Sequence, residues 1–222
     1  MILKLKERRL TPQIIIFDLD GTLVDSKADI TFAFNLTLEE FGLPSVAENV
    51  IADFVGTGVR PLMRQVIPEG SQVQYADLAK RFEQLYAENL SRETRLFPGF
   101  EQVLHQWADR QKYILTNKLQ YFTDKLLKEI GLSDVFMGVF GRDAFERSKP
   151  DPLPIIEICR IARVDTSQAV MIGDTPVDVT AGKAAGASTV GVSWGYSAAG
   201  VLEASGPDVI VHSPKDLLNT IP

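Results

Sequence analysis

The sequence predicts an α/β fold, in which one parallel sheet carries helices on both faces and is interrupted after its first strand by an all-helical insert. From residue 97 onward, short apolar runs alternate with helical patterns, as in a parallel sheet with helical crossovers. These apolar runs are continuous, which is typical of strands buried on both faces. Residues 26–93 show helical spacing and no convincing strand.

The first strand is predicted at 14–18, where three isoleucines in succession precede Phe17. Helical patterns follow, one ending at Gly42 and Pro44 and another carrying apolar residues near 78–86. The linkers are expected near 22–26 and 91–98. We therefore predict a core of residues 1–22 and 96–222 and a helical domain of residues 23–95.

The second part of the core is predicted element by element from the same patterns. Its helices are expected at 100–111, 120–130, 152–163, 176–185, near 198–204 and at 214–219. Its strands are expected at 112–116, within 135–140, and at 169–172, 189–192 and 209–211.

Composition excludes several classes of function. The chain has 222 residues, 45% of them hydrophobic and 23% charged, as in a globular protein of one or two domains. A net charge of −6 argues against nonspecific nucleic-acid binding, which needs a basic surface. No apolar run is long enough to span a membrane. Cys159 is the single cysteine, so no intramolecular disulfide is possible, and a small buried side chain is expected.

The N-terminal residues MILKLKERRL are basic, and the apolar run that follows them is too short for a signal peptide. We therefore expect a cytoplasmic protein with a solvated basic leader that contains Lys4, Lys6, Arg8 and Arg9.

Polar residues follow several strands at the edge where parallel sheets bind ligands. Asp18 and Asp20 follow the first strand, and burial of two carboxylates so close together is costly without a compensating cation. A hard divalent ion is the usual remedy, and one carboxylate can then attack as a nucleophile while the other transfers protons. Other strands and loops add a hydroxyl, an amide, a lysine and two further acids: Thr116, Asn117, Lys149, Asp174 and Asp178.

Acids for a metal together with a hydroxyl and an ammonium for an anion make a phosphate site chemically sensible. Each residue also has a simpler reading. Asp18 and Asp20 could form an acidic turn around Gly21, and Asp174 and Asp178 could cap a helix. Likewise, a threonine can simply end a strand and a lysine can lie on the surface.

Five motifs occur in a characteristic order: FDLDGTLVDS, LTNK, SKPDP, IGDTPVDVTAGKAAG and TVGVSWGY. Together they cover nearly the whole chain, which resembles the phosphoglycolate phosphatase-like branch of the haloacid dehalogenase superfamily. The resemblance implies a Rossmann-like core, a helical cap and a Mg²⁺-dependent phosphatase that works through an aspartyl-phosphate.

The resemblance also implies roles for the acids. Asp18 is expected to be the nucleophile and Asp20 the general acid and base. Mg²⁺ is expected on the carboxylates of Asp18 and Asp174 and the backbone carbonyl of Asp20, with Asp178 bound through water or supporting the site. The dehalogenases of this superfamily lack an acid at the position of Asp20, so its presence favours phosphoryl chemistry.

Thr116 and Lys149 are expected to bind the transferring phosphoryl group, with help from backbone N–H groups of Leu19, Asp20 and Asn117. Lys149 is also expected to offset the charges of Asp18 and Asp174. For the Asn117 side chain, a turn residue without substrate contact stays open. For Lys118, solvent exposure and a role in the site are equally open.

The cap is expected to close over the site and select the substrate. Gly56 and Gly58 would let the backbone approach a ligand, and Arg60 could meet a substrate carboxylate, although a turn with a surface arginine is the alternative. For Arg142, a structural salt bridge is at least as plausible as a substrate contact.

The expected partner is a small phosphorylated metabolite, without nucleic acid or membrane, and both a monomer and a homodimer stay open. By resemblance the leading substrate is 2-phosphoglycolate. Pyrophosphate, sugar phosphates and a β-phosphoglucomutase reaction are alternatives, and a non-catalytic binding module is a remote one.

Overall fold

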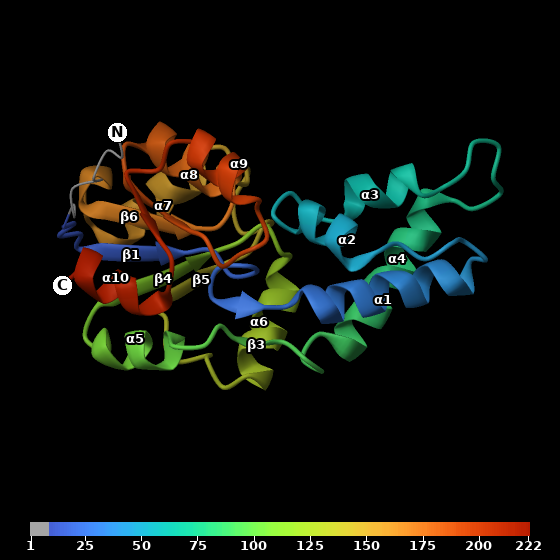
Figure 1. Ribbon diagram of the computed structural model, residues 1–222, viewed down its shortest axis with the longest axis horizontal. Helices are drawn as coiled ribbons and strands as arrows, with labels where there is room; N and C mark the ends of the chain where they lie inside the picture. Colours follow the sequence, from blue (N-terminus) through green and yellow to red (C-terminus); the bar gives the residue numbers. More distant parts are fainter. Residues whose placement is uncertain (1–8) are drawn as a thin grey trace.

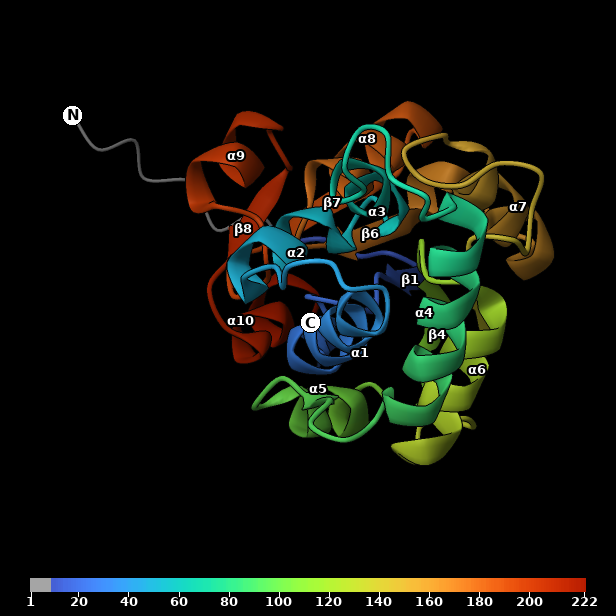
Figure 2. The ribbon, with the colours of Figure 1, turned by 90° about the vertical axis from the view of Figure 1, so that its right-hand side faces the viewer.

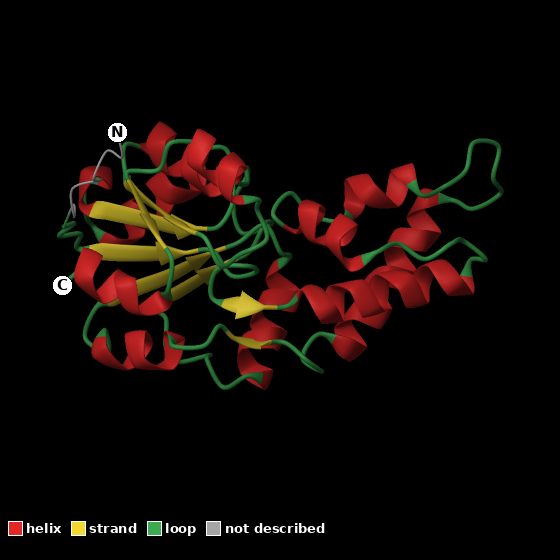
Figure 3. Ribbon diagram, viewed as in Figure 1, coloured by secondary structure: helices red, strands yellow, loops and turns green. Residues whose placement is uncertain are grey.

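The core is a six-stranded sheet in the order β5-β4-β1-β6-β7-β8, with every neighbouring pair parallel (Figures 1 and 3). Its strands are β1 (Ile14–Phe17), β4 (Gln111–Leu115), β5 (Gly138–Phe140), β6 (Ala169–Gly173), β7 (Ser188–Val192) and β8 (Val209–Val211). The computed structural model describes residues 9–222, so most of the predicted basic leader lies outside the described residues. The predicted parallel α/β core is confirmed.

Both faces of the sheet are buried, because alternate side chains of β1 enter different clusters. Ile15 and Phe17 pack on one face, and Ile14 and Ile16 pack on the other. The covering helices are α5 (Phe100–Gln106), α6 (Gln120–Glu129), α7 (Leu153–Ala162), α8 (Pro176–Ala185), α9 (Ala199–Ala204) and α10 (Pro214–Thr220). A short 3-10 helix, η1 (Thr166–Gln168), leads into β6. Cys159 is buried in the second cluster, as predicted.

Four helices form the helical insert, which extends from one end of the core (Figures 1 and 2). They are α1 (Lys27–Glu40), α2 (Glu48–Val55), α3 (Arg60–Gln65) and α4 (Tyr75–Asn89). Phe34 of α1 meets Phe82 of α4 edge to face, with ring centroids 6.0 Å apart. None of the helices within residues 9–222 has the length and apolar character needed to cross a membrane.

The two linkers of the insert pair with each other. β2 (Val24–Asp25) and β3 (Arg95–Leu96) form a short antiparallel ribbon. The buried carboxylate of Asp29 accepts hydrogen bonds from the backbone N–H groups of Glu93 and Thr94 and from the Thr94 hydroxyl. The entry and exit of the insert are therefore fastened together.

The predicted helix over 100–111 is too long, because α5 ends at Gln106. Beyond it, the Lys112 ammonium donates hydrogen bonds to the carbonyls of Trp107, Ala108 and Arg110. The Lys112 side chain thus supplies donors to carbonyl groups that would have accepted backbone N–H groups if the helix had continued.

Candidate active site

The loops at the carboxyl ends of the strands bring the predicted acids together. Asp18 follows β1 and Asp174 follows β6, while Asp178 lies in the first turn of α8. These three residues, which we call the acidic cluster, are buried, and each offers a carboxylate oxygen within 4.8 Å of the others. The predicted convergence of these acids is therefore seen in the structure.

One ammonium faces the acidic cluster. Lys149 Nζ lies 2.8 Å from Asp18 Oδ1 and 2.5 Å from Asp178 Oδ1, and its side chain is 2% exposed. Burial raises the pKa of Asp18 to about 7, because desolvation and the neighbouring acids outweigh the attraction of Lys149. Burial, followed by the charges of Asp18 and Asp178, raises the pKa of Asp174 well above its usual value.

Lys149 pairs with Asp18, as expected, and its second ion pair is with Asp178 and not with Asp174. Asp174 is held by other groups: the Thr22 hydroxyl donates to Oδ1 at 3.1 Å and the Tyr196 N–H to Oδ2 at 2.8 Å. Asp178 uses Oδ2 to accept from the Thr175 N–H and hydroxyl, which caps α8, and leaves Oδ1 for Lys149. Asp178 therefore caps α8, as one reading expected, and its role at a metal stays a prediction.

The carboxylate of Asp20 lies apart from the acidic cluster. The Ser26 hydroxyl donates to Asp20 Oδ1 at 2.5 Å, and Lys118 Nζ lies 2.9 Å from Oδ2. Lys118, which the sequence left open, is buried, with a side chain 5% exposed. Its backbone N–H donates to the Thr116 hydroxyl at 3.1 Å, so a tight turn after β4 directs its side chain inward.

Tyr196 is a residue that sequence reasoning missed. Besides its N–H bond to Asp174, its hydroxyl accepts from the N–H groups of Ser26 at 2.7 Å and Lys27 at 3.1 Å and donates to Asp25 at 3.1 Å. It therefore joins the acidic cluster to the start of α1. A signal was present in the TVGVSWGY motif: a side chain at Gly195 would collide with Asp174, so this backbone approaches the cluster closely.

Gly56 and Asn117 form a contact between the insert and the core. Asn117 Nδ2 donates to the carbonyls of Gly56 and Lys149, each at 3.0 Å. A Cβ at Gly56 would lie 2.7 Å from Thr175 Cγ2. The backbone at Gly56 thus lies close to the core, and its expected approach to a ligand stays a prediction. Asn117 Oδ1 is buried and finds no hydrogen-bond partner in the described part of the chain.

Leu19 lies within the turn that carries the two acids. Its side chain is fully buried, and its carbonyl accepts from the N–H groups of Leu23 and Val24 at 2.9 and 3.0 Å. The turn is therefore held rigidly. A role of the Leu19 N–H in phosphate binding stays a prediction.

A cavity of about 470 Å³ lies between the insert and the core. Its wall includes Asp20, Asn117 and Lys118 from the core and Phe82 and Tyr86 from α4. These residues place the Asp20 carboxylate beside a partly aromatic chamber.

The two arginines discussed above also line the cavity. Arg60 is half exposed and lies 2.7 Å from Glu83 Oε1, so its guanidinium already has a carboxylate partner. Arg142 is exposed, and within residues 9–222 no carboxylate lies at salt-bridge distance from it. The salt bridge considered for Arg142 is therefore not seen.

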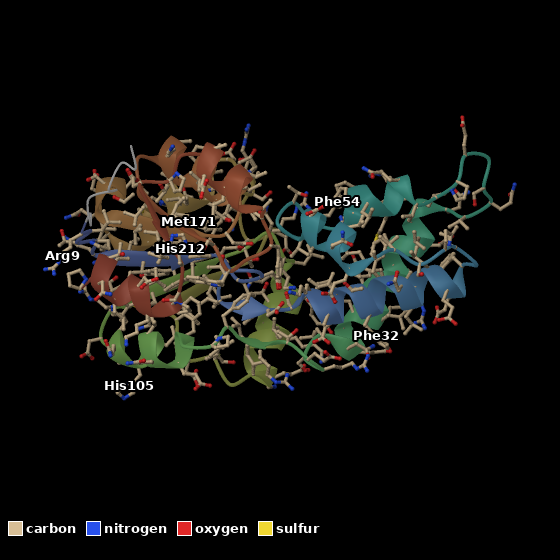
Figure 4. All side chains as sticks on the ribbon, viewed as in Figure 1. Arg9, Phe32, Phe54, His105, Met171 and His212 are labelled. Atoms are coloured by element: carbon tan, nitrogen blue, oxygen red, sulfur yellow. The ribbon has the colours of Figure 1, made fainter. Side chains whose placement is uncertain are left out.

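The two histidines lie on the core, away from its junction with the insert (Figure 4). His212 Nδ1 is 2.8 Å from the Ser193 hydroxyl, and His105 is exposed on α5. Neither belongs to the acidic cluster, so the oxygen atoms of carboxylates and of the backbone are the ligands on offer. Three buried carboxylates facing one ammonium fit a hard divalent cation.

Comparison with known proteins agrees with this geometry. The model of the haloacid dehalogenase-like hydrolase family matches residues 15–192. A protein of Nitrosococcus oceani named phosphoglycolate phosphatase is 34% identical over 95% of this chain and 96% of its own. One of the same name from Aquifex aeolicus is 33% identical over 93% and 95%.

Solved structures show the same fold. A protein of Haemophilus somnus described as a predicted phosphoglycolate phosphatase superposes with a TM-score of 0.87 at 27% identity, over 96% of this chain and 97% of that one. A haloacid dehalogenase-like hydrolase of Streptococcus pneumoniae gives 0.81 at 28% identity, over 94% and 97%. The family match spans most of the chain, and this protein therefore belongs to the haloacid dehalogenase-like hydrolases.

Proposed function

We propose that this protein is a Mg²⁺-dependent phosphatase that hydrolyses a small phosphomonoester through an aspartyl-phosphate on Asp18. The observation that carries the proposal is the separation of two carboxylates: Asp18 lies in the acidic cluster, and Asp20 lines the cavity beside it. Because relatives with more than 30% identity are named phosphoglycolate phosphatase, 2-phosphoglycolate is the leading substrate.

The proposed metal site uses the carboxylates of Asp18 and Asp174 and the backbone carbonyl of Asp20, with Asp178 contributing through water. When bound, Mg²⁺ would neutralise the acids and polarise a phosphoryl oxygen. The structure supports this assignment through the charge imbalance of the acidic cluster and the raised pKa values of Asp18 and Asp174.

In the proposed first step, an oxygen of Asp18 attacks phosphorus in line and the bond from phosphorus to the ester oxygen breaks. Asp20 gives its proton to the departing oxygen. In the second step, water attacks the phosphorus of the aspartyl-phosphate, Asp20 takes the proton of that water, and phosphate leaves as the Asp18 carboxylate re-forms.

Lys149 would orient the nucleophile, a role supported by its simultaneous ion pairs with Asp18 and Asp178. The same ammonium, the Thr116 hydroxyl and the N–H groups of Leu19, Asp20 and Asn117 would bind the oxygens of the transferring group. Fixed donors aimed at developing charge are worth about 10²–10³ in rate each.

Residues 23–95 would act as the cap over a core of residues 1–22 and 96–222. The insert touches the core at Gly56 and at Tyr86, next to the proposed site. The cap would exclude water while Asp18 attacks. The proposed partner is a small phosphorylated metabolite of the cytoplasm.

The test is phosphate release from a panel of small phosphoesters and pyrophosphate, with Mg²⁺ or EDTA, by the wild type and Asp18→Asn. We expect one substrate to be turned over far better than the others, and this activity to vanish in EDTA and in the variant. Activity that survives Asp18→Asn would contradict the proposed nucleophile. No turnover of any substrate by the wild type would favour a non-catalytic module.

A further inference from the structure

Three cations line the cavity, and they differ sharply in burial. The Arg60 side chain is 51% exposed and paired with Glu83. Arg142 is exposed at the rim. The Lys118 side chain is 5% exposed, so it is the cation whose charge is least screened by water.

Lys118 is held by two oxygens, one from each part of the molecule. Its Nζ lies 2.9 Å from Asp20 Oδ2 in the core and 2.5 Å from the Tyr86 hydroxyl on α4. Nζ also lies 4.7 Å from the centre of the Tyr86 ring. The Lys118 side chain is therefore an ammonium held against a carboxylate and a phenol oxygen.

An ammonium has three N–H donors. Two have acceptors in the described part of the chain, in Asp20 and Tyr86. Lys118 also belongs to the wall of the cavity, so its remaining donor is available to an anion placed there.

The position of Lys118 relative to the reacting bond follows from Asp20. A general acid lies within about 3 Å of the oxygen that it protonates. Since Lys118 Nζ is 2.9 Å from Asp20 Oδ2, it lies within about 6 Å of an ester oxygen that Oδ2 protonates. A carboxylate on the neighbouring carbon of the leaving group falls within its reach.

We propose that Lys118 binds the carboxylate of the leaving group and thereby selects carboxylate-bearing phosphomonoesters over neutral ones of the same size. This inference rests on the proposed phosphatase function and assigns the selectivity of that same site. Phe82 and Phe122 also line the cavity, and their low polarity strengthens an ion pair. The sequence pointed to Arg60 for this contact, but Arg60 is already bound to Glu83.

The test compares 2-phosphoglycolate with 2-phosphoglycolamide, which has nearly the same size and a neutral leaving group. In Lys118→Met we expect KM for 2-phosphoglycolate to rise about 10–100-fold, the value of a hydrogen bond to a charged group, while KM for the amide is nearly unchanged. Lys125→Met, at a lysine on α6 that pairs with Glu129 outside the cavity, is the matched control, and it should change neither KM appreciably. An equal loss on both substrates, through kcat alone, would mean that Lys118 only positions Asp20, and would overturn the proposal.

A binding measurement separates this inference from the proposed function. In the Asp18→Asn background, calorimetry with Mg²⁺ should show tighter binding of 2-phosphoglycolate than of the amide, and Lys118→Met should abolish the difference. If Asp18→Asn with Lys118 intact binds 2-phosphoglycolate and the amide equally, the anion site is refuted, even if the wild type is a phosphatase. If the wild type hydrolyses neither compound but keeps the binding preference, the anion site stands and the proposed function fails.

Lys118→Arg guards against a folding defect, because it keeps the charge. We expect it to retain the preference for 2-phosphoglycolate in the calorimetric experiment. If Lys118→Arg folds and binds both compounds equally, the proposal is wrong.

Discussion

The two halves of the candidate site balance their charges differently. Within residues 9–222, the acidic cluster has three buried carboxylates facing the single ammonium of Lys149. On the other side, Asp20 has one carboxylate matched by one ammonium, that of Lys118, and by the Ser26 hydroxyl. The first half lacks a positive charge and the second does not. This difference marks the acidic cluster as the half in which the proposed divalent cation would be bound, and variants in each half test it.

Asp18→Asn should lower activity more than any of the other changes, yet it should raise the stability of the metal-free protein. Loss of a nucleophile costs on the order of 10⁴-fold or more in kcat, by analogy with other covalent mechanisms. Without metal, the same change relieves the crowding of negative charge. We therefore expect a higher melting temperature than that of the wild type in EDTA at pH 8, measured by calorimetry. A lower one would show that the cluster is balanced without a cation.

Lys149→Met removes the ammonium of the acidic cluster. We expect kcat to fall about 10²–10³-fold, because a fixed donor at the transferring group is lost. Unpairing buried charges should also destabilise the metal-free protein by about 3 kcal/mol, measured by urea unfolding in EDTA. An unchanged unfolding midpoint would mean that the carboxylates are screened by something other than Lys149.

The stability of the metal-free protein should fall as pH rises from about 4 to 7. Asp18 has a folded pKa of about 7 against an ordinary value of 3.8, so the folded protein retains a proton that the unfolded chain has released. The contribution is absent below pH 4 and reaches about 4 kcal/mol of destabilisation above pH 7.

The readout of this pH effect is the difference in melting temperature between Asp18→Asn and the wild type. In EDTA we expect this difference to grow with pH. In saturating Mg²⁺ we expect the sign of this difference to reverse. Bound Mg²⁺ then stabilises the wild type, whereas the variant binds Mg²⁺ more weakly. A difference that is independent of pH would disprove the raised pKa of Asp18.

Tyr196→Phe should lower activity the least, and it should affect the half of the site that contains Asp20 but not the acidic cluster. The hydroxyl that bonds the N–H groups of Ser26 and Lys27 is lost, at a cost of about 1–2 kcal/mol. The N–H bond from Tyr196 to Asp174 does not involve the side chain. We therefore expect a few-fold lower kcat with the same Mg²⁺ concentration at half-maximal activity. A changed Mg²⁺ requirement would show that the two halves are not independent.

The same two halves differ in how far they could be predicted. Asp18 and Asp174 follow buried strands, and strand ends of a parallel sheet meet at one edge, so the convergence of the acidic cluster followed from the pattern. The contact between Lys118 and Tyr86 joins a turn of the core to a helix of the insert, and spacing along the chain carries no information about such a pair. The same holds for Tyr196 and the start of α1.

Local bonds explain the remaining differences. The end of α5 depends on Lys112 turning back to the carbonyls of Trp107 and its neighbours, which helical periodicity cannot reveal. The choice of Asp178 over Asp174 as the partner of Lys149 depends on which oxygens are already occupied by Thr22, Thr175 and Tyr196.

The ribbon of β2 and β3 joins the two ends of the insert, so the insert could be exchanged as a unit. Val24 lies opposite Leu96, and Asp29 fastens the returning chain at Glu93 and Thr94, so the chain enters and leaves the insert at one place. Because these two ends are joined, we expect a helical segment of another length or sequence to fit between them without moving the strand before Asp18. With the cap role proposed for residues 23–95, grafting such a segment would change the substrate preference.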